Sequence, residues 1–231
     1  MPASRLAPRV LIIGASRGIG FEFARQYLAD GATVIATARD DDGLQRLKSL
    51  GAQALRLDVS DAASVSGLAW LLDGEALDIA LYVAGVFPQA DARTPPTHDE
   101  FDRTMHTNVL GAMQSIPQVA PLVEAARSGR GVFAFISSAM AKIDAVESSY
   151  GWAYRVSKAA LNMAVASAQH NYPKAIMVAI SPGWVQTDMG GAGASLTVTQ
   201  SVTSMRAALA ALTPADKGGF LNYNGQPFGA W

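Results

Sequence analysis

Residues 10–20 read V-L-I-I-G-A-S-R-G-I-G, and this stretch decides the fold. Its first four residues are apolar, which predicts a short strand buried on both faces. Three glycines follow, at Gly14, Gly18 and Gly20. Apolar residues then recur at helical spacing up to residue 31. The stretch therefore predicts a strand, a glycine turn and a helix, and the free backbone N–H groups of such a turn favour the binding of a phosphate.

A second motif overlaps the glycine turn, because residues 14–18 also match the G-x-S-x-G nucleophile elbow of serine hydrolases, with Ser16 as the nucleophile. An elbow serine needs an oxyanion hole, and one donor of that hole comes from the loop after an earlier strand. Only one strand precedes Ser16 in this sequence, so we favour the phosphate-binding interpretation. A glycine turn that binds no ligand is the third alternative.

Strands and helices alternate along the rest of the chain. We expect further strands over residues 32–37, 53–57, 77–84, 131–137 and 175–180 and near residue 220, and helices over residues 40–50, 61–72, 99–126, 151–171 and 198–212. The helix over 61–72 should be capped near Ser60, and Pro117 and Pro121 should kink or interrupt the helix over 99–126. The alternation is typical of an α/β protein with one domain over residues 1–231, a doubly wound (Rossmann-like) parallel sheet with helices on both faces. Residues 1–8 are expected to form a flexible arm.

The composition excludes several classes of function. The 231 residues carry 18 basic and 19 acidic side chains, which give no reason to expect a nucleic acid or an anionic membrane as partner. The absence of cysteine excludes disulfides, a thiol nucleophile and thiolate metal sites, and the three histidines do not cluster as metal ligands would. No apolar run approaches ~18 residues and the first nine residues lack a signal-peptide core, so we expect a soluble, cytoplasmic protein without a bound metal.

A tyrosine and a lysine stand four residues apart in the expected helix over 151–171, in the sequence Tyr154-Arg155-Val156-Ser157-Lys158. This spacing places both side chains on one helix face, where the ammonium of Lys158 should lower the pKa of the Tyr154 phenol. Alone the pattern is weak, since such a pair is more often a solvated lysine beside a packed ring. Ser137 and Ser138 close the expected strand just before this helix, and they bring a hydroxyl that can share a substrate oxygen with Tyr154.

With these motifs in order, nearly the whole chain resembles the short-chain dehydrogenase/reductase family. The resemblance rests on six stretches: G-A-S-R-G-I-G at 14–20, L-D-V at 57–59, N-V-L-G at 108–111, I-S-S at 136–138, Y-R-V-S-K at 154–158 and P-G-W-V-Q-T at 182–187. Within the family, Y-R-x-S-K, P-G-W-V-x-T-D-M-G-G and F-x-N-Y-x-G are similar to carbonyl reductases of the sniffer and C-factor-like branch. One motif departs. The family's N-N-A-G is replaced by Y-V-A-G at 82–85, so the asparagine contacts that brace the central strand must be absent or replaced.

The resemblance implies a role for each matching residue. It implies that Tyr154 is the acid/base, that Lys158 lowers the Tyr154 pKa and holds the nicotinamide ribose, and that Asn108 supports a water-linked proton relay. It assigns the orientation of the carbonyl to Ser138, because the family usually uses the second serine. Asp58 and Val59 are expected to contact the adenine, Ala84 and Gly85 the adenosine ribose, and Thr187 the nicotinamide carboxamide. The other expected contacts of the cofactor are Gly14, Ser16, Arg17, Gly18, Ile19, Gly20, Arg39, Tyr154, Lys158, Pro182 and Gly183.

The end of the second expected strand bears on the choice of cofactor. NAD-binding chains of this fold place Asp or Glu there, ~20 residues past the glycine turn, to accept hydrogen bonds from the ribose hydroxyls. In this chain Ala38 holds the position of that acid, and Arg39 follows it. Arg39 and Arg17 can flank a 2′-phosphate with charge-assisted hydrogen bonds, so we expect NADP(H). The alternative is that both arginines are solvated and that an aspartate within 40–42 serves a ribose.

We therefore expect an oxidoreductase that transfers a hydride between NADP(H) and a ketone or aldehyde, or an alcohol in the reverse direction. The pocket walls should come from loops over 86–96, 139–150 and 184–197, whose side chains favour a fairly apolar substrate. These side chains include Phe87, Met140, Ile143, Val146, Trp184, Met189 and Leu196. A dinucleotide-binding signalling or regulatory protein without turnover is the alternative function, and assembly into a homo-oligomer stays open.

Overall fold

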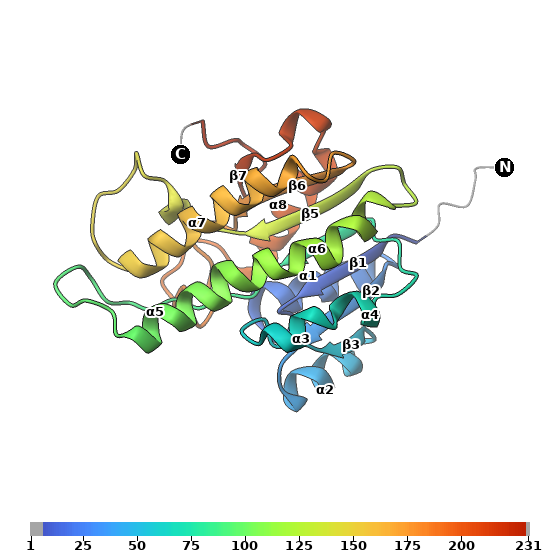
Figure 1. Cartoon of the computed structure of the whole chain (residues 1–231), viewed down its shortest axis with the longest axis horizontal. Coiled ribbons are helices and arrows are strands. Elements are labelled where there is room, and N and C mark those ends of the chain that lie inside the picture. The colour runs from blue at the N-terminus through green and yellow to red at the C-terminus, as the bar shows by residue number, and fades with distance from the viewer. Residues whose placement is uncertain (1–6, 230–231) are drawn as a thin grey trace.

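The frame of the molecule is one seven-stranded parallel sheet, seen in a computed structural model that describes residues 7–229 (Figure 1). The strands are β1 (Arg9–Ile13), β2 (Thr33–Ala38), β3 (Gln53–Arg56), β4 (Ile79–Tyr82), β5 (Gly131–Ile136), β6 (Ala175–Ser181) and β7 (Phe220–Asn222). Their order across the sheet is β3-β2-β1-β4-β5-β6-β7. The order reverses at β1, which pairs with β2 on one side and with β4 on the other. The predicted doubly wound α/β fold is therefore confirmed.

Helices cover both faces of the sheet. They are α1 (Gly18–Ala29), α2 (Asp41–Leu50), α3 (Ala62–Ser66), α4 (Leu68–Leu71), α5 (His98–Met105), α6 (Gly111–Glu124), α7 (Trp152–Gln169) and α8 (Val198–Ala211). In β1, Val10 and Ile12 belong to the core that α1, α2 and α8 complete, whereas Leu11 and Ile13 belong to the core on the opposite face, with α6 and α7. All four side chains are fully buried, as expected of a strand covered on both faces.

The single helix expected over residues 61–72 is wrong. Two short helices, α3 and α4, occupy this stretch and meet at Gly67, a residue with a low helix propensity. The cap lies near Ser60 as expected, but it is not Ser60 itself, because the hydroxyl and the N–H of Ser60 both donate to the Asp58 carboxylate. Asp61 caps α3 instead, and its carboxylate accepts a hydrogen bond from the Ala63 N–H at 3.0 Å.

The long helix expected over residues 99–126 is interrupted, but not at its prolines. A π-helical turn over residues 106–110 separates α5 from α6, whereas Pro117 and Pro121 lie inside α6. Both prolines are exposed and stand four residues apart on one face, so the carbonyl groups that they leave without a helical partner can bond to water. The π-helical turn contains Asn108, one of the residues expected to be catalytic.

The expected flexible arm, residues 1–8, lies outside the described residues except for Ala7 and Pro8. The Pro8 carbonyl accepts a hydrogen bond from the Thr33 N–H, and the Ala7 carbonyl accepts one from the Arg127 side chain. Among residues 7–229, no helix has the length and the apolar character that crossing a membrane requires.

Candidate active site

The glycine turn lies where the strand order reverses, toward the left of Figure 1, where the carboxyl ends of the strands lie. The N–H groups of Val83 and Ala84 donate to the Ile13 carbonyl at 2.8 and 3.1 Å, so the chain leaving β4 runs beside the turn. Gly14 has a φ of +87°, and a Cβ at this position would lie 2.7 Å from the Ala84 nitrogen. A Cβ at Gly20 would collide with the Gly14 carbonyl oxygen. Both positions therefore require glycine.

Thr37 in β2 also shapes the turn, although the sequence motifs did not indicate it. Its hydroxyl accepts a hydrogen bond from the Gly14 N–H at 3.0 Å, and its carbonyl accepts one from the Ala15 N–H at 2.8 Å. Thr37 is buried. A hydroxyl group near the carboxyl end of β2, after three apolar residues, is the one sequence signal that could have indicated this residue.

The start of α1 has the properties that a phosphate group requires. The helix begins at Gly18 without a side-chain cap, so its first backbone N–H groups have no partner within the helix. A Cβ at Gly18 would lie 3.6 Å from the Thr187 methyl group, so a side chain here would fill the approach between the two segments. Ser16 and Ile19 lie beside this approach and are half-buried. An uncapped helix N-terminus with an open approach fits a pyrophosphate.

Strand β5 and helix α7 bring together the three groups expected to act on a substrate. Tyr154 and Lys158 lie one turn apart on the buried face of α7 and are 8% and 3% exposed. Ser138 follows β5, and its hydroxyl is hydrogen-bonded to that of Tyr154. The Lys158 ammonium donates to the Ile136 carbonyl at 2.7 Å and lies 5.6 Å from the centre of the Tyr154 ring. Ser137 is turned elsewhere, because its hydroxyl donates to the Asn162 side chain at 2.6 Å.

The electrostatics of this group correct one expectation. Burial raises the pKa of Tyr154 to about 12, and the hydrogen bond with Ser138 offsets only part of that rise. Burial also lowers the pKa of Lys158 to about 7, because its ammonium has lost its contact with water. The net pKa of Tyr154 is therefore raised rather than lowered as expected, because burial outweighs the other effects in this structure. At neutral pH, Tyr154 carries a neutral hydroxyl that can donate a proton.

Asn108 connects the chain after β4 to α7. Its side-chain oxygen accepts a hydrogen bond from the Val86 N–H at 2.8 Å, and its amide nitrogen donates to the Val86 carbonyl at 3.0 Å. The same nitrogen donates to the Ser157 hydroxyl at 2.9 Å, and Ser157 donates to the Tyr154 carbonyl at 2.7 Å. Asn108 is fully buried. Its amide thus holds two segments of the site in register.

The residues expected at the adenosine lie along the same edge of the sheet. Gly85 lies between two groups expected to be catalytic, since a Cβ there would be 3.3 Å from the Asn108 amide oxygen and 3.5 Å from the Lys158 ammonium. Val59 is buried beside the π-helical turn. Hydrogen bonds from Ser60 hold the Asp58 carboxylate in a turn after β3. These bonds, and then the charge of Arg39, lower the pKa of Asp58.

The two arginines expected at a 2′-phosphate are both exposed. Arg17 forms an ion pair with Asp188, with 2.5 Å between Nη1 and Oδ2, which joins the glycine turn to the segment after Thr187. Arg39 follows β2 and acts on the charge of Asp58 from there. The two guanidinium groups therefore act on different carboxylates in this structure, Asp188 for Arg17 and Asp58 for Arg39.

A third arginine, which the sequence motifs did not indicate, lies beside the glycine turn. The Arg46 Nε in α2 donates to the Ser16 carbonyl at 3.2 Å. Helix α2 can lie this close because Gly43 has no side chain: a Cβ there would lie 2.8 Å from the Cβ atoms of both Ser16 and Ala38. Arg46 stands seven residues beyond Arg39 in an amphipathic helix. It belongs to no sequence motif, so no pattern in the sequence could have revealed this contact.

Thr187 organises the segment that faces the glycine turn. Its hydroxyl accepts a hydrogen bond from the Gly190 N–H at 3.1 Å, and its carbonyl accepts one from the Gly191 N–H at 2.8 Å. The Trp184 indole donates to the Gly190 carbonyl at 2.8 Å. This segment is therefore a compact turn, and the methyl group of Thr187 lies toward Gly18.

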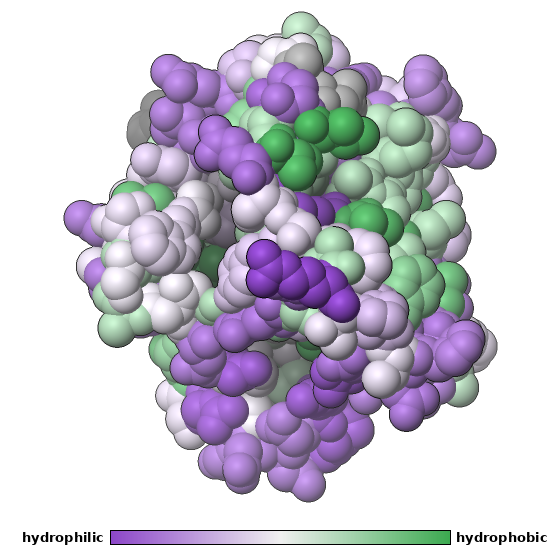
Figure 2. All heavy atoms as spheres, turned by 90° about the vertical axis from the view of Figure 1, so that its left-hand side faces the viewer, coloured by the Kyte–Doolittle hydropathy of each residue, from purple (hydrophilic) through white to green (hydrophobic). Residues whose placement is uncertain are grey.

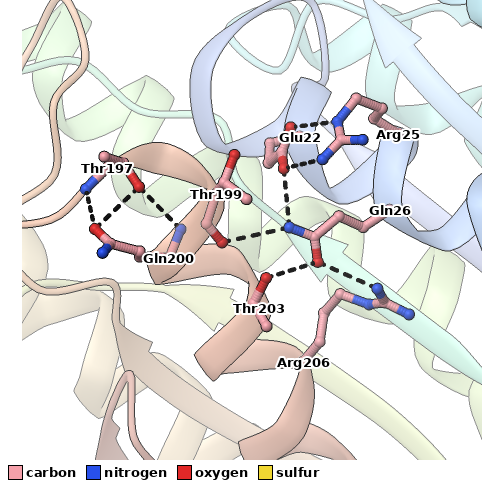
Figure 3. Close-up of polar contacts among 8 residues, drawn as sticks. All are labelled: Glu22, Arg25, Gln26, Thr197, Thr199, Gln200, Thr203 and Arg206. Atoms are coloured by element: carbon pink, nitrogen blue, oxygen red, sulfur yellow. Dashed lines mark hydrogen bonds and ion pairs between the residues drawn. The ribbon is translucent and has the colours of Figure 1, made fainter.

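Helix α8 fixes the far end of the same segment to α1 (Figure 3). Gln26 of α1 makes hydrogen bonds with Glu22, Thr199, Thr203 and Arg206. At the start of α8, the Ser201 hydroxyl donates to the Pro182 carbonyl at 2.6 Å. Gly183 follows with a φ of +78° and packs against Leu196, which closes the segment. Helix α1, which begins in the glycine turn, thus also anchors the segment that faces this turn.

Aromatic and apolar side chains cover the Tyr154 ring. The Phe87 ring meets it edge to face with 4.7 Å between centroids, and Phe87 meets Tyr150 in the same way at 5.6 Å. Gly151 allows this packing, because a Cβ there would lie 2.6 Å from the Phe87 ring and 3.2 Å from the Met140 methyl. Figure 2 faces this edge of the molecule and shows hydrophilic residues gathered over its lower part, where α2 and α3 lie in Figure 1.

Ser16 lacks the partner that a serine nucleophile needs. Within residues 7–229, no hydrogen bond joins its hydroxyl to a histidine, and all three histidines are exposed. They are His98, His106 and His170. The structure therefore gives the serine hydrolase alternative no general base.

Comparison with known proteins agrees with this geometry. The family model described as short chain dehydrogenase matches residues 8–195. The C-signal protein of Myxococcus xanthus is 34% identical over 151 residues, which cover 64% of this chain and 90% of that protein. The carbonyl reductase Sniffer of D. melanogaster has a TM-score of 0.87 at 27% identity, with 97% of this chain and 100% of that chain covered. A carbonyl reductase from Pseudomonas aeruginosa PAO1 in complex with NADP has a TM-score of 0.83 at 30% identity, with the same coverage. This protein therefore belongs to the short-chain dehydrogenase/reductase family, and within it to the sniffer and C-factor type.

Proposed function

We propose that this protein is an NADP(H)-dependent oxidoreductase that reduces a ketone or an aldehyde, with Tyr154 as the proton donor. The observation that carries the proposal is the meeting of Tyr154, Ser138 and Lys158 at the edge of the sheet that also holds the glycine turn. The relatives support it, because two of them are carbonyl reductases and one of these was crystallised with NADP. Bound reduced nicotinamide would supply the hydride.

The hydroxyl groups of Tyr154 and Ser138 suit the stabilisation of a developing alkoxide. Two hydroxyl donors that already bond to one another can both bond to one substrate oxygen. Tyr154 then gives up its proton, and the charged form of Lys158 stabilises the phenolate that results. Its pKa of about 12 keeps Tyr154 protonated at neutral pH, which is the form that carbonyl reduction requires.

Asn108 supports the same chemistry by position. Its amide is engaged with Val86 and Ser157, so we assign its part in a proton relay to its backbone carbonyl. This leaves the side chain with the task of holding the chain after β4 against α7.

The phosphorylated cofactor suits the adenosine end of the site. The uncapped start of α1 would hold the pyrophosphate, and Arg39, Arg17 and Arg46 would surround the 2′-phosphate. Ala38 offers no carboxylate to a ribose. Each hydrogen bond between an arginine and a phosphate contributes ~1.5–3 kcal/mol, so two of them give a preference for NADP(H) of at least ~10²-fold.

A fairly apolar substrate suits the surroundings of Tyr154. Phe87 and Tyr150 contact one another beside the reactive hydroxyl, and Trp184, Ile143 and Met189 are exposed in the loops that follow the strands. An aromatic or long-chain aliphatic carbonyl would bury this surface.

The test is a panel of aldehydes and ketones, assayed by the loss of absorbance of NADPH and, in parallel, of NADH. We expect turnover with NADPH and a preference for apolar carbonyls over small polar ones. The similarity to C-signal keeps the regulatory alternative in view, in which the protein binds the cofactor without turnover. Cofactor binding by fluorescence titration with no turnover across the panel would favour that alternative.

A further inference from the structure

Tyr82 occupies the first position of the motif in which this chain departs from its family. It is the last residue of β4, is fully buried and stacks on Phe135 of β5 with 6.1 Å between ring centroids. Its hydroxyl donates to the Thr107 carbonyl at 2.7 Å. The side chain thus reaches from the centre of the sheet into the π-helical turn between α5 and α6.

The contact falls at the point where the helix departs from α geometry. In an α-helix the Gly111 N–H would bond to the Thr107 carbonyl, but here it bonds to the His106 carbonyl. The Thr107 carbonyl accepts the Tyr82 hydroxyl instead. A Cβ at Gly111 would lie 2.6 Å from the Tyr82 hydroxyl oxygen, so this glycine leaves the space that the tyrosine uses.

The Thr107 carbonyl belongs to the peptide group that leads into Asn108. The Asn108 amide bonds to both backbone groups of Val86 and to Ser157, and Ser157 bonds to the Tyr154 carbonyl. One peptide group and a series of hydrogen bonds therefore connect the Tyr82 hydroxyl with the helix turn that carries Tyr154. All of these side chains are buried or half-buried, so water cannot easily replace a lost bond.

We propose that Tyr82 is a positioning residue, whose hydroxyl holds the π-helical turn so that Asn108 keeps the chain after β4 and the start of α7 in register. Burial raises the pKa of Tyr82, so its hydroxyl remains a donor over the working pH range. The effect on turnover rests on the proposed function, whereas the effect on local structure does not.

The structural arm of the test compares Tyr82→Phe with Tyr27→Phe. Each substitution removes one buried hydroxyl, and that of Tyr27 bonds to Arg206 between α1 and α8, away from the π-helical turn. Amide hydrogen exchange should become ~10-fold faster over residues 84–87 and 106–111 in Tyr82→Phe, and should be unchanged there in Tyr27→Phe. Unchanged exchange in both segments of Tyr82→Phe overturns the inference, whatever the turnover.

The kinetic arm uses NADPH and the best carbonyl of the panel. Tyr82→Phe should lower kcat ~10-fold and change the KM for NADPH less than ~3-fold, because misplacement of groups near the reacting atoms acts on the rate. In an Asn108→Ala background, the same substitution should change kcat less than ~2-fold, since Tyr82 acts through Asn108. Equal losses in both backgrounds overturn the inference. An inactive wild-type protein contradicts the proposed function instead, and the exchange measurement then decides the role of Tyr82.

Discussion

Lys158 and Arg39 are two cations at the same edge of the sheet, and their surroundings differ. Lys158 is 3% exposed and donates to the Ile136 carbonyl, and burial lowers its pKa to about 7. Arg39 is exposed, and its guanidinium lies in water. Electrostatic interactions are strong in a dry environment, whereas salt and water screen an exposed charge. We call the surroundings of Lys158 and Tyr154 the buried end of the site, and the surroundings of Arg39 the exposed end. We therefore expect changes at the buried end to act on the chemical step, and changes at the exposed end to act on the choice and binding of the cofactor.

The largest effect is expected at the buried end, from Tyr154→Phe. The substitution removes only the hydroxyl that we propose as the proton donor, and a general acid contributes ~10²–10⁴ in rate. We expect kcat to fall by this factor. Steady-state assays with NADPH check it, and Tyr150→Phe is the control, since Tyr150 lies beside the same Phe87 ring but does not bond to Ser138. A Tyr154→Phe protein with a third or more of the wild-type kcat would contradict the assigned role.

The next effect belongs to the exposed end. The double substitution Ala38→Asp with Arg39→Ile should turn a preference for NADPH of at least ~10²-fold into a preference for NADH, because the carboxylate accepts ribose hydroxyls and repels a 2′-phosphate. The measurement is kcat/KM with both reduced cofactors. Arg127→Ile, at an exposed arginine that bonds to the Ala7 carbonyl, should leave the ratio unchanged. Equal kcat/KM values with the two cofactors for the unmodified protein, or a preference for NADH, would contradict the assignment of NADP(H) as the cofactor.

A smaller effect should appear in the pH dependence of the buried end. As the pH rises through about 7, Lys158 loses its proton and can no longer stabilise the phenolate, whereas Tyr154 stays protonated up to about 12. The kcat/KM for reduction should therefore fall ~10-fold between pH 6 and pH 9. Lys158→Met should be slower at every pH, bind NADPH more weakly and lose this decline. A flat profile for the wild-type protein, or the same decline in Lys158→Met, would refute the part given to Lys158.

The smallest effect concerns the exposed ion pair between the glycine turn and the segment after Thr187. The Arg17–Asp188 pair is solvent-exposed, so it contributes less than ~1 kcal/mol to holding the 188–198 segment closed. Asp188→Asn should speed proteolytic cleavage of this segment by up to ~3-fold without cofactor, and saturating NADPH should slow cleavage several-fold as the glycine-rich segment closes over the nicotinamide. Cleavage at the exposed turn over 127–130 provides the internal control. If NADPH leaves the rate of cleavage within 188–198 unchanged, the segment is not a lid.

Much of the fold could be predicted because each buried strand of a parallel sheet is a short apolar run with a helical repeat behind it. The corrections occur where local signals compete. Ser60 and Asp61 are both good caps, and only the contact of Ser60 with Asp58 decides between them. Pro117 predicts a break, but its exposed position lets water replace the lost hydrogen bond.

The candidate site could be predicted in its motifs but not in its long-range contacts. The spacing of Tyr154 and Lys158 follows from helix geometry, whereas the pairing of Arg17 with Asp188 joins residues 171 positions apart. The Tyr82 hydroxyl reaches Thr107 only because a helix turn widens at that point. The pKa of Tyr154 depends on the competition between burial and the hydrogen bond with Ser138, and no spacing in the sequence measures burial.

The division between the two ends is tested most directly by one pair of measurements on two variants, Tyr154→Phe and Arg39→Ala. For each, the Kd for NADPH is measured by fluorescence titration and the single-turnover rate of NADPH oxidation by stopped flow at saturating cofactor. We predict that Tyr154→Phe loses at least ~10²-fold in rate with a Kd within ~3-fold of wild type, and that Arg39→Ala raises the Kd at least ~10-fold with a rate within ~3-fold. A Tyr154→Phe protein that oxidises NADPH at a third or more of the wild-type rate, or an Arg39→Ala protein with an unchanged Kd, would contradict this account.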